Sequence, residues 1–122
     1  MIKKYKQRLG KCGEDLAVSF LKKKGFEILE RNYRYGHKEI DIIGKDKNTV
    51  VFIEVKTGRS KNFGSPQEWV NLRKQKSMIE VAQDYIQQNN FTDFDFRFDV
   101  VAINIEKGKR EIEHIENAFM VS

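Results

Sequence analysis

Residues 36–56 read GHKEIDIIGKDKNTVVFIEVK, and this stretch decides the fold. Two apolar runs, residues 39–43 and 49–56, flank a polar segment at residues 44–48. Valine and isoleucine favour strands, and a short polar segment containing glycine is typical of a turn. The stretch therefore predicts two adjacent strands that pair as a hairpin.

The first of these strands carries acidic side chains. Because successive side chains of a strand point to opposite faces, Glu39 and Asp41 share one face and Ile40 and Ile42 share the other. Strands this apolar are usually covered on both faces, so charged groups on them are partly desolvated. The acids need a physical reason to be there.

The second strand adds a third acid and a lysine. Glu54 and Lys56 lie on one face, opposite Val51, Ile53 and Val55. If the strands pair as a hairpin, three carboxylates and one ammonium group converge near one point. A divalent cation is the simplest explanation for that convergence.

Length and composition limit the class of protein. The chain of 122 residues suits a single domain over residues 1–122. One cysteine, Cys12, and two histidines exclude a disulfide framework and a Cys/His zinc site. Cys12 is interpreted as a small core residue. We expect a reduced, cytoplasmic protein, because no signal peptide or membrane-spanning run is present.

The net charge of +5 favours polyanionic partners, nucleic acid first. A merely solvated basic surface is the alternative. The basic residues fall on both sides of the acidic strands, so they could surround an acidic centre and attract backbone phosphates. They are Lys3, Lys4, Lys6, Arg8 and Lys11, followed by Arg59, Lys61, Arg73, Lys74 and Lys76.

The segments outside the hairpin predict a mixed α/β fold. An apolar period of three and four residues predicts a helix over residues 8–24 that ends at Gly25. Glu14 lies at the margin of its apolar stripe and could face a cleft, or it is a solvated glutamate near the helix N-terminus. Residues 26–35 predict an irregular strand and residues 57–65 a loop. A second helix is predicted from the capping box Ser65-Pro66-Gln67-Glu68 to Asn89-Asn90, with a bend at residues 73–76. Two further strands are predicted at residues 94–105 and 110–115. On the last strand, His114 is expected to pack or lie at the surface.

The acidic strands suit phosphodiester hydrolysis. Mg²⁺ binds hard oxygen ligands, typically one or two carboxylates together with phosphate oxygens and water, and Asp41 and Glu54 could supply the carboxylates. Lys56 could hold the attacking water or a phosphate oxygen as a fixed positive charge. The alternative is that Glu54 and Lys56 form an ordinary ion pair.

The chain resembles a known family in several motifs. Asp41, twelve further residues and then Glu54-Val55-Lys56 are similar to the Asp…(Asp/Glu)-x-Lys signature of the restriction-endonuclease-like nuclease superfamily. More closely, the chain resembles the YraN-like family of small bacterial proteins, which is related in fold to Holliday-junction resolvases. The matching segments are Gly13-Glu14 with Ala17 and Leu21, residues 39–43, 51–57, Phe63-Gly64, Lys74, residues 97–101 and 117–119.

This resemblance implies a restriction-endonuclease-like single domain with a mixed sheet, in the order helix, three strands, helix, two strands. It also implies that Asp41 and Glu54 bind Mg²⁺ or Mn²⁺, that Lys56 is the catalytic lysine and that Glu14 is a fourth member of the site, with Glu39 as an accessory. The leading hypothesis is a metal-dependent endonuclease acting on DNA more than on RNA, with branched DNA and a homodimer suggested by the resolvases. Arg59, Lys61, Arg73, Lys74 and Lys76 are expected to bind nucleic acid. The rival hypotheses are a nucleic-acid-binding module without catalysis and a protein-interaction protein.

Overall fold

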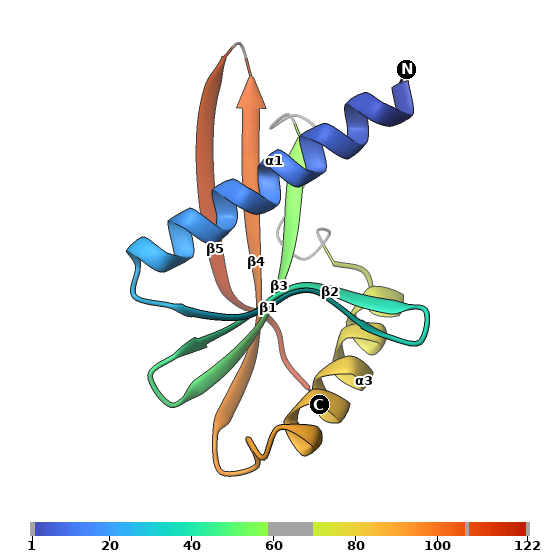
Figure 1. The fold of residues 1–122 in the computed structure, drawn as a ribbon, viewed down its shortest axis with the longest axis vertical. Coiled ribbons are helices and arrows are strands. Elements are labelled where there is room, and N and C mark those ends of the chain that lie inside the picture. The colour runs from blue at the N-terminus through green and yellow to red at the C-terminus, as the bar shows by residue number, and fades with distance from the viewer. Residues whose placement is uncertain (1, 59–69, 107, 122) are drawn as a thin grey trace.

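The computed structural model describes residues 2–58, 70–106 and 108–121. This part of the chain forms two helices and a five-stranded mixed sheet, which confirms the predicted mixed α/β class (Figure 1). The elements are α1 (Ile2–Lys23), β1 (Glu27–Tyr35), β2 (Lys38–Asp46), β3 (Thr49–Gly58), α3 (Leu72–Gln88), β4 (Asp95–Glu106) and β5 (Lys109–Phe119).

The strands lie in the order β1-β2-β3-β4-β5, so neighbours in the chain are neighbours in the sheet. Only β3 and β4 are parallel, and α3 lies in the connection between them, as a parallel pair requires. The sheet is strongly twisted. The β1–β2 ribbon runs across the direction of β4 and β5 in Figure 1.

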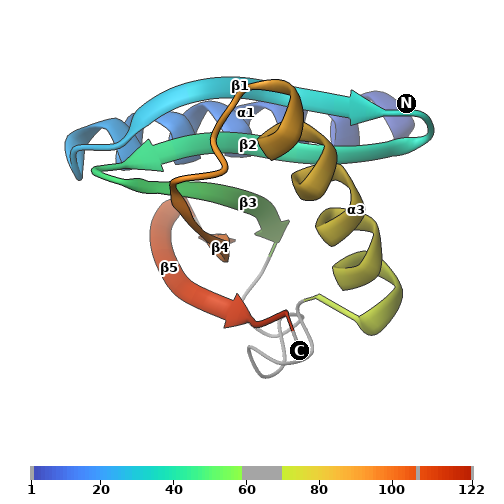
Figure 2. The same cartoon turned by 90° about the horizontal axis from the view of Figure 1, so that it is seen from below.

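Each face of the sheet is covered by one helix (Figure 2). Apolar side chains of α1 pack with Ile42, Val51 and Ile53, whereas those of α3 pack with Val50 and Phe52. The alternation of Val50 to Ile53 between the two clusters is the predicted period of two. It leaves Glu54 and Lys56 on the face that α3 covers, opposite Ile53 and Val55.

Helix α1 ends where the sequence predicts but begins earlier. The amide of Phe26 donates to the Leu21 carbonyl at 3.0 Å and Gly25 adopts a positive φ of 99°, a helix end for which glycine is favoured. The helix begins at Ile2 instead of residue 8, and Cys12 is exposed, so its predicted core role is wrong. No helix among the described residues is long and apolar enough to cross a membrane.

Within the described residues, the second predicted helix begins at Leu72. Asn71 is the N-cap of α3, with an extended backbone at φ −73° and ψ 168°, and its side chain accepts a hydrogen bond from the amide of Lys74 at 2.9 Å. A helix continuing through Asn71 is therefore excluded, and the basic run at residues 73–76 forms the first turn of α3 instead of a bend. The predicted capping box at residues 65–68 lies outside the described residues, as does most of the predicted loop at 57–65.

Strand β2 departs from the prediction in length and in facing. It continues through Gly44 to Asp46, so the turn to β3 is shorter than predicted. Ile40 packs in the cluster under α3 and Ile42 in the cluster under α1, so the two do not share a face. The regular alternation thus fails around Asp41, which lies between them.

Candidate functional site

Strands β2 and β3 separate beside Asp41. Their pairing runs from Asp46 opposite Thr49 to Ile42 opposite Ile53 and continues no further. Beyond this point the amide of Val55 donates to the Asp41 carboxylate (Oδ2) at 2.8 Å. The Asp41 side chain therefore replaces the missing backbone partner, and the opening between the strands is lined by side chains.

Glu54 enters the same opening from β3. It is one of two buried acids in the described residues, with 7% of its surface exposed. Its carboxylate (Oε2) lies 3.2 Å from the ammonium group of Lys74 on α3, and that ammonium group is also 3.4 Å from the backbone carbonyl of Glu39. Among the described residues, the ion pair of Glu54 is thus with Lys74 and not with Lys56, against the simple ion-pair alternative.

The closeness of the two acids changes their chemistry. Burial, and then the adjacent Glu54 carboxyl group, raise the pKa of Asp41 from 3.8 to about 8, although the Val55 amide and Lys74 act in the opposite direction. Ionisation of Asp41 beside Glu54 is therefore unfavourable in the absence of a cation. A site that holds two carboxyl groups in this way favours binding of a positive ion.

Glu14 reaches the site from α1. The preceding residue, Gly13, lies against Thr57 on β3, and a methyl group at that position would collide with the Thr57 side chain. The absence of a side chain at Gly13 lets α1 approach β3 closely, so that Glu14 lies near Asp41. Burial, followed by the charge on Asp41, raises the pKa of Glu14. This placement favours the cleft-facing interpretation of Glu14.

Asn32 is a member of the site that sequence reasoning missed. With its amide nitrogen turned toward the acids, Asn32 donates to Glu14 (Oε1) at 2.8 Å and to Glu39 (Oε1) at 2.9 Å. Its backbone has a positive φ of 52°, which asparagine tolerates better than most residues. Glu39, which also lies 3.6 Å from Arg34, is therefore connected to the site through Asn32.

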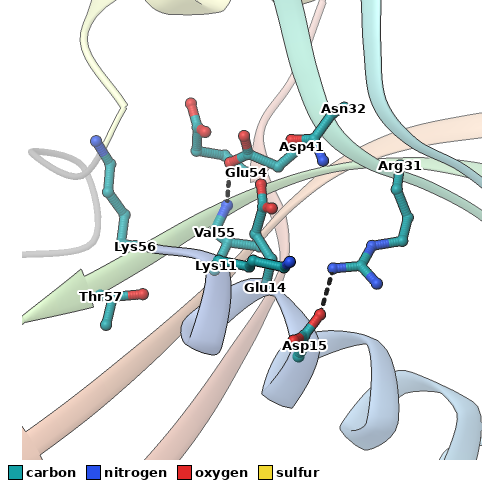
Figure 3. Close-up of a pocket in the computed structure, with 10 residues that line it drawn as sticks. All are labelled: Lys11, Glu14, Asp15, Arg31, Asn32, Asp41, Glu54, Val55, Lys56 and Thr57. Carbon is teal, nitrogen blue, oxygen red and sulfur yellow. Dashed lines mark hydrogen bonds and ion pairs between the residues drawn. The ribbon is translucent and has the colours of Figure 1, made fainter. Parts of the chain in front are cut away.

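These side chains surround one open pocket of 790 Å³ (Figure 3). The carboxyl groups of Glu14, Asp41 and Glu54 gather at its centre, and Lys56 extends beside them from β3. An ion pair of 2.6 Å between Arg31 and Asp15 lies at the rim. The lining residues are Lys11, Glu14, Asp15, Arg31, Asn32, Asp41, Glu54, Val55, Lys56 and Thr57.

The predicted basic residues divide between two places. Arg73, Lys74 and Lys76 line a second pocket of 530 Å³ at the start of α3, together with Lys38, Asn71, Ser77 and Glu80. Lys38, which sequence reasoning did not assign to a site, forms an ion pair with Glu80 there. Arg59 and Lys61 lie outside the described residues, as do the side chains of Lys3, Lys4, Lys6 and Arg8, whereas Lys11 lines the first pocket.

The carboxylates of this pocket fit a hard cation that is bound by only one or two protein ligands. No group of three or more His, Cys, Asp or Glu side chains in the described residues is arranged to hold a metal. Mg²⁺ and Mn²⁺ accept oxygen donors, and Mg²⁺ commonly binds through one or two carboxylates. The Val55 carbonyl is a further candidate oxygen, because the N–H and C=O groups of one strand residue point to the same side and the Val55 amide faces Asp41.

The second buried acid, Asp99 on β4, shows what a structural carboxylate looks like in this fold. Its oxygens lie 3.1 Å from Nε of Arg97, 2.7 Å from Nε2 of His114 and 3.1 Å from the amide of Asn117. These contacts join β4 to β5 and give His114 the packing role predicted for it. Glu54, by contrast, has one ion-pair partner in the described residues and faces an open pocket.

Comparison with known proteins yields one family and close relatives. A family model described as "Uncharacterised protein family UPF0102" matches residues 13–103. A UPF0102 protein of Chloroherpeton thalassium is 50% identical over 90% of this chain and 92% of its own. A UPF0102 protein of Caldanaerobacter subterraneus is 43% identical over 98% of this chain and all of its own. Among solved structures, SfsA of Pyrococcus furiosus in complex with Ca²⁺ matches 91% of this chain and 63% of that chain, at 15% identity and a TM-score of 0.42.

Proposed function

The chain belongs to the uncharacterised protein family UPF0102, and because that name carries no activity, we propose a function from the site: a Mg²⁺- or Mn²⁺-dependent endonuclease that hydrolyses phosphodiester bonds in DNA. Membership confirms the predicted YraN-like resemblance, while the restriction-endonuclease-like superfamily remains part of the proposal. The observation that carries the proposal is that Asp41 of β2 and Glu54 of β3 lie together at an open pocket. Lys56, on the same strand as Glu54, lines this pocket too.

The roles of the residues follow from their positions. Asp41 and Glu54 would hold the cation, which when bound neutralises phosphate charge and lowers the pKa of a bound water. Lys56 would place a positive charge beside the scissile phosphate or the attacking water. Glu14, whose pKa is raised by burial and by Asp41, would orient a water molecule beside the two acids.

The second pocket, at the start of α3, is called the basic groove here, and its charge supports a polyanionic substrate. Arg73, Lys74 and Lys76 lie together at a helix start, where backbone amides also favour phosphate. Contacts of this kind position the backbone and carry no sequence information. DNA rather than RNA, branched substrates and a homodimer rest on the resemblance to Holliday-junction resolvases.

The test is nicking of supercoiled plasmid and of a four-way DNA junction with Mg²⁺ or Mn²⁺. Glu54→Gln and Lys56→Met should each reduce the rate by about 100-fold or more, the usual effect of removing one group that stabilises the transition state. Lys22→Met, which removes the same charge from the exposed end of α1, should cleave at the parent rate. Equal nicking by the parent and Glu54→Gln would assign the activity to a contaminant.

A second candidate is a nucleic-acid-binding module without catalysis, which the basic groove favours independently of the acids. Such a module would bind DNA with a steep salt dependence and would be indifferent to EDTA. Absence of nicking combined with this behaviour would decide for the module. Binding that is undetectable or insensitive to salt would instead favour a protein partner.

A further inference from the structure

Lys74 stands between the two pockets. It lines the basic groove with Arg73 and Lys76. Its ammonium group nevertheless lies 3.2 Å from the carboxylate of Glu54, which lines the first pocket. Its side chain is 35% exposed, whereas that of Glu54 is 9% exposed. Lys74 is thus the one lysine in the described residues that contacts both the acids and the groove.

The base and the tip of this side chain are held by different contacts. The Lys74 amide is bonded to the Asn71 side chain, which anchors the backbone at the start of α3. The ammonium group, by contrast, is held by Glu54 and by a longer contact of 3.4 Å to the Glu39 carbonyl. A flexible four-carbon stem allows this group to move between the acids and the groove without movement of the helix.

We propose that Lys74 is a resident counter-ion of the carboxylate site, and that it leaves Glu54 for the basic groove when a divalent cation binds, so that its ammonium group then binds the DNA backbone. This inference rests on the proposed metal site and deepens it. It makes cation binding and DNA binding cooperative, because the cation frees a positive charge for phosphate and phosphate in the groove draws that charge from Glu54.

The charge of Lys74 determines how its removal changes the affinity of the site for a cation. A divalent cation adds positive charge to the site, so loss of the nearby lysine charge favours cation binding. Without Lys74, the cation also has no half-buried ion pair with Glu54 to break. An ion pair with a partly exposed partner contributes modestly, so Lys74→Met should bind the cation about three- to tenfold more tightly than the parent.

The first experiment measures binding of Mn²⁺ alone by calorimetry, without DNA. Lys74→Met should bind more tightly than the parent by the factor above, while Lys22→Met, a charge-matched change on the exposed end of α1, should stay within about twofold of the parent. Lys74→Arg retains the charge and should resemble the parent. Thermal melting confirms that each variant is folded.

The outcomes separate the inference from the function on which it rests. If the parent binds Mn²⁺ and Lys74→Met binds it equally or less tightly, the resident counter-ion is refuted and the metal site stands. If the parent does not bind Mn²⁺, both the metal site and the inference are refuted.

The second experiment measures the coupling with DNA. Fluorescence anisotropy of a labelled junction in Ca²⁺ and in EDTA should show that the cation strengthens binding to the parent by about fivefold or more. Lys74→Met should lose most of this gain, whereas Lys22→Met should keep it. An equal gain in Lys74→Met would overturn the proposed movement of Lys74.

Discussion

Removal of the Asp41 charge should stabilise the protein when no metal is present. The pKa of Asp41 is raised from 3.8 to about 8 by burial and by Glu54, so the folded protein binds the proton more tightly than the unfolded chain. The stability contributed by that proton is fully present below the unfolded pKa and is lost as the pH rises through the folded pKa. Asp41→Asn cannot ionise, and its amide oxygen can still accept the hydrogen bond from Val55.

The magnitude follows from the same two pKa values. At pH 7 just over three pH units separate the solution from the unfolded pKa of Asp41, and each unit corresponds to about 1.4 kcal/mol, so the variant could gain on the order of 4 kcal/mol. Even a quarter of this would raise the melting temperature by roughly 3 to 6 °C in a chain of 122 residues. The gain should grow between about pH 4 and pH 8.

The assay is thermal unfolding of the parent and Asp41→Asn in EDTA across that pH range, with the exposed Asp93→Asn as the matched control. Added Mg²⁺ should narrow the difference, because a cation that binds the native site stabilises mainly the parent. A variant that is less stable than the parent at pH 8, or a difference independent of pH, would refute the placement of Asp41 against Glu54.

Two further predictions concern the close approach of α1 to the sheet and the buried carboxylate of Asp99. Gly13→Ala should destabilise the fold by about 1–3 kcal/mol in urea unfolding, because the added methyl group meets Thr57, and the loss should be smaller in a Thr57→Ala background; equal losses in the two backgrounds would contradict the close approach of α1 to β3. Asp99→Asn should lower the free energy of unfolding by about 2 kcal/mol or more, because Asp99 is fully buried among its partners. Glu116 also pairs with Arg97 but is half exposed, so Glu116→Gln should change the free energy of unfolding by less than about 0.5 kcal/mol. Comparable effects of the two substitutions would show that Asp99 does not hold β4 to β5.

The acidic pair could be predicted because it depends on local pattern. Alternation along β3 places Glu54 and Lys56 on one face, and the short turn after β2 brings Asp41 to the neighbouring strand whatever the rest of the chain does. The end of α1 at Gly25 is likewise a local signal, since a positive φ there favours glycine. These features need no knowledge of distant contacts.

The remainder depends on contacts between segments far apart in sequence. Cys12 is exposed because the buried side of α1 is the one that carries Gly13, Ala17 and Leu21, a rotation set by where the helix meets the sheet. Likewise Asn32 contacts Glu14, eighteen positions earlier, and no periodicity indicates that pairing. The N-cap of α3 at Asn71 is not predicted, because a single asparagine before a basic run is a weak helix-start signal in the sequence.

Several departures from regular structure lie around Asp41. Ile40 and Ile42 break the alternation on either side of Asp41, Asn32 takes a left-handed backbone, and β2 leaves β3 immediately beyond Ile53. Such departures destabilise a fold unless the surrounding structure compensates for them, and they are expected at functional sites. The packing of the sheet requires no acid beside Glu54, because a neutral side chain could also accept the Val55 hydrogen bond. The unfavourable closeness of the two carboxyl groups therefore agrees with the proposed cation site and does not serve the stability of the domain.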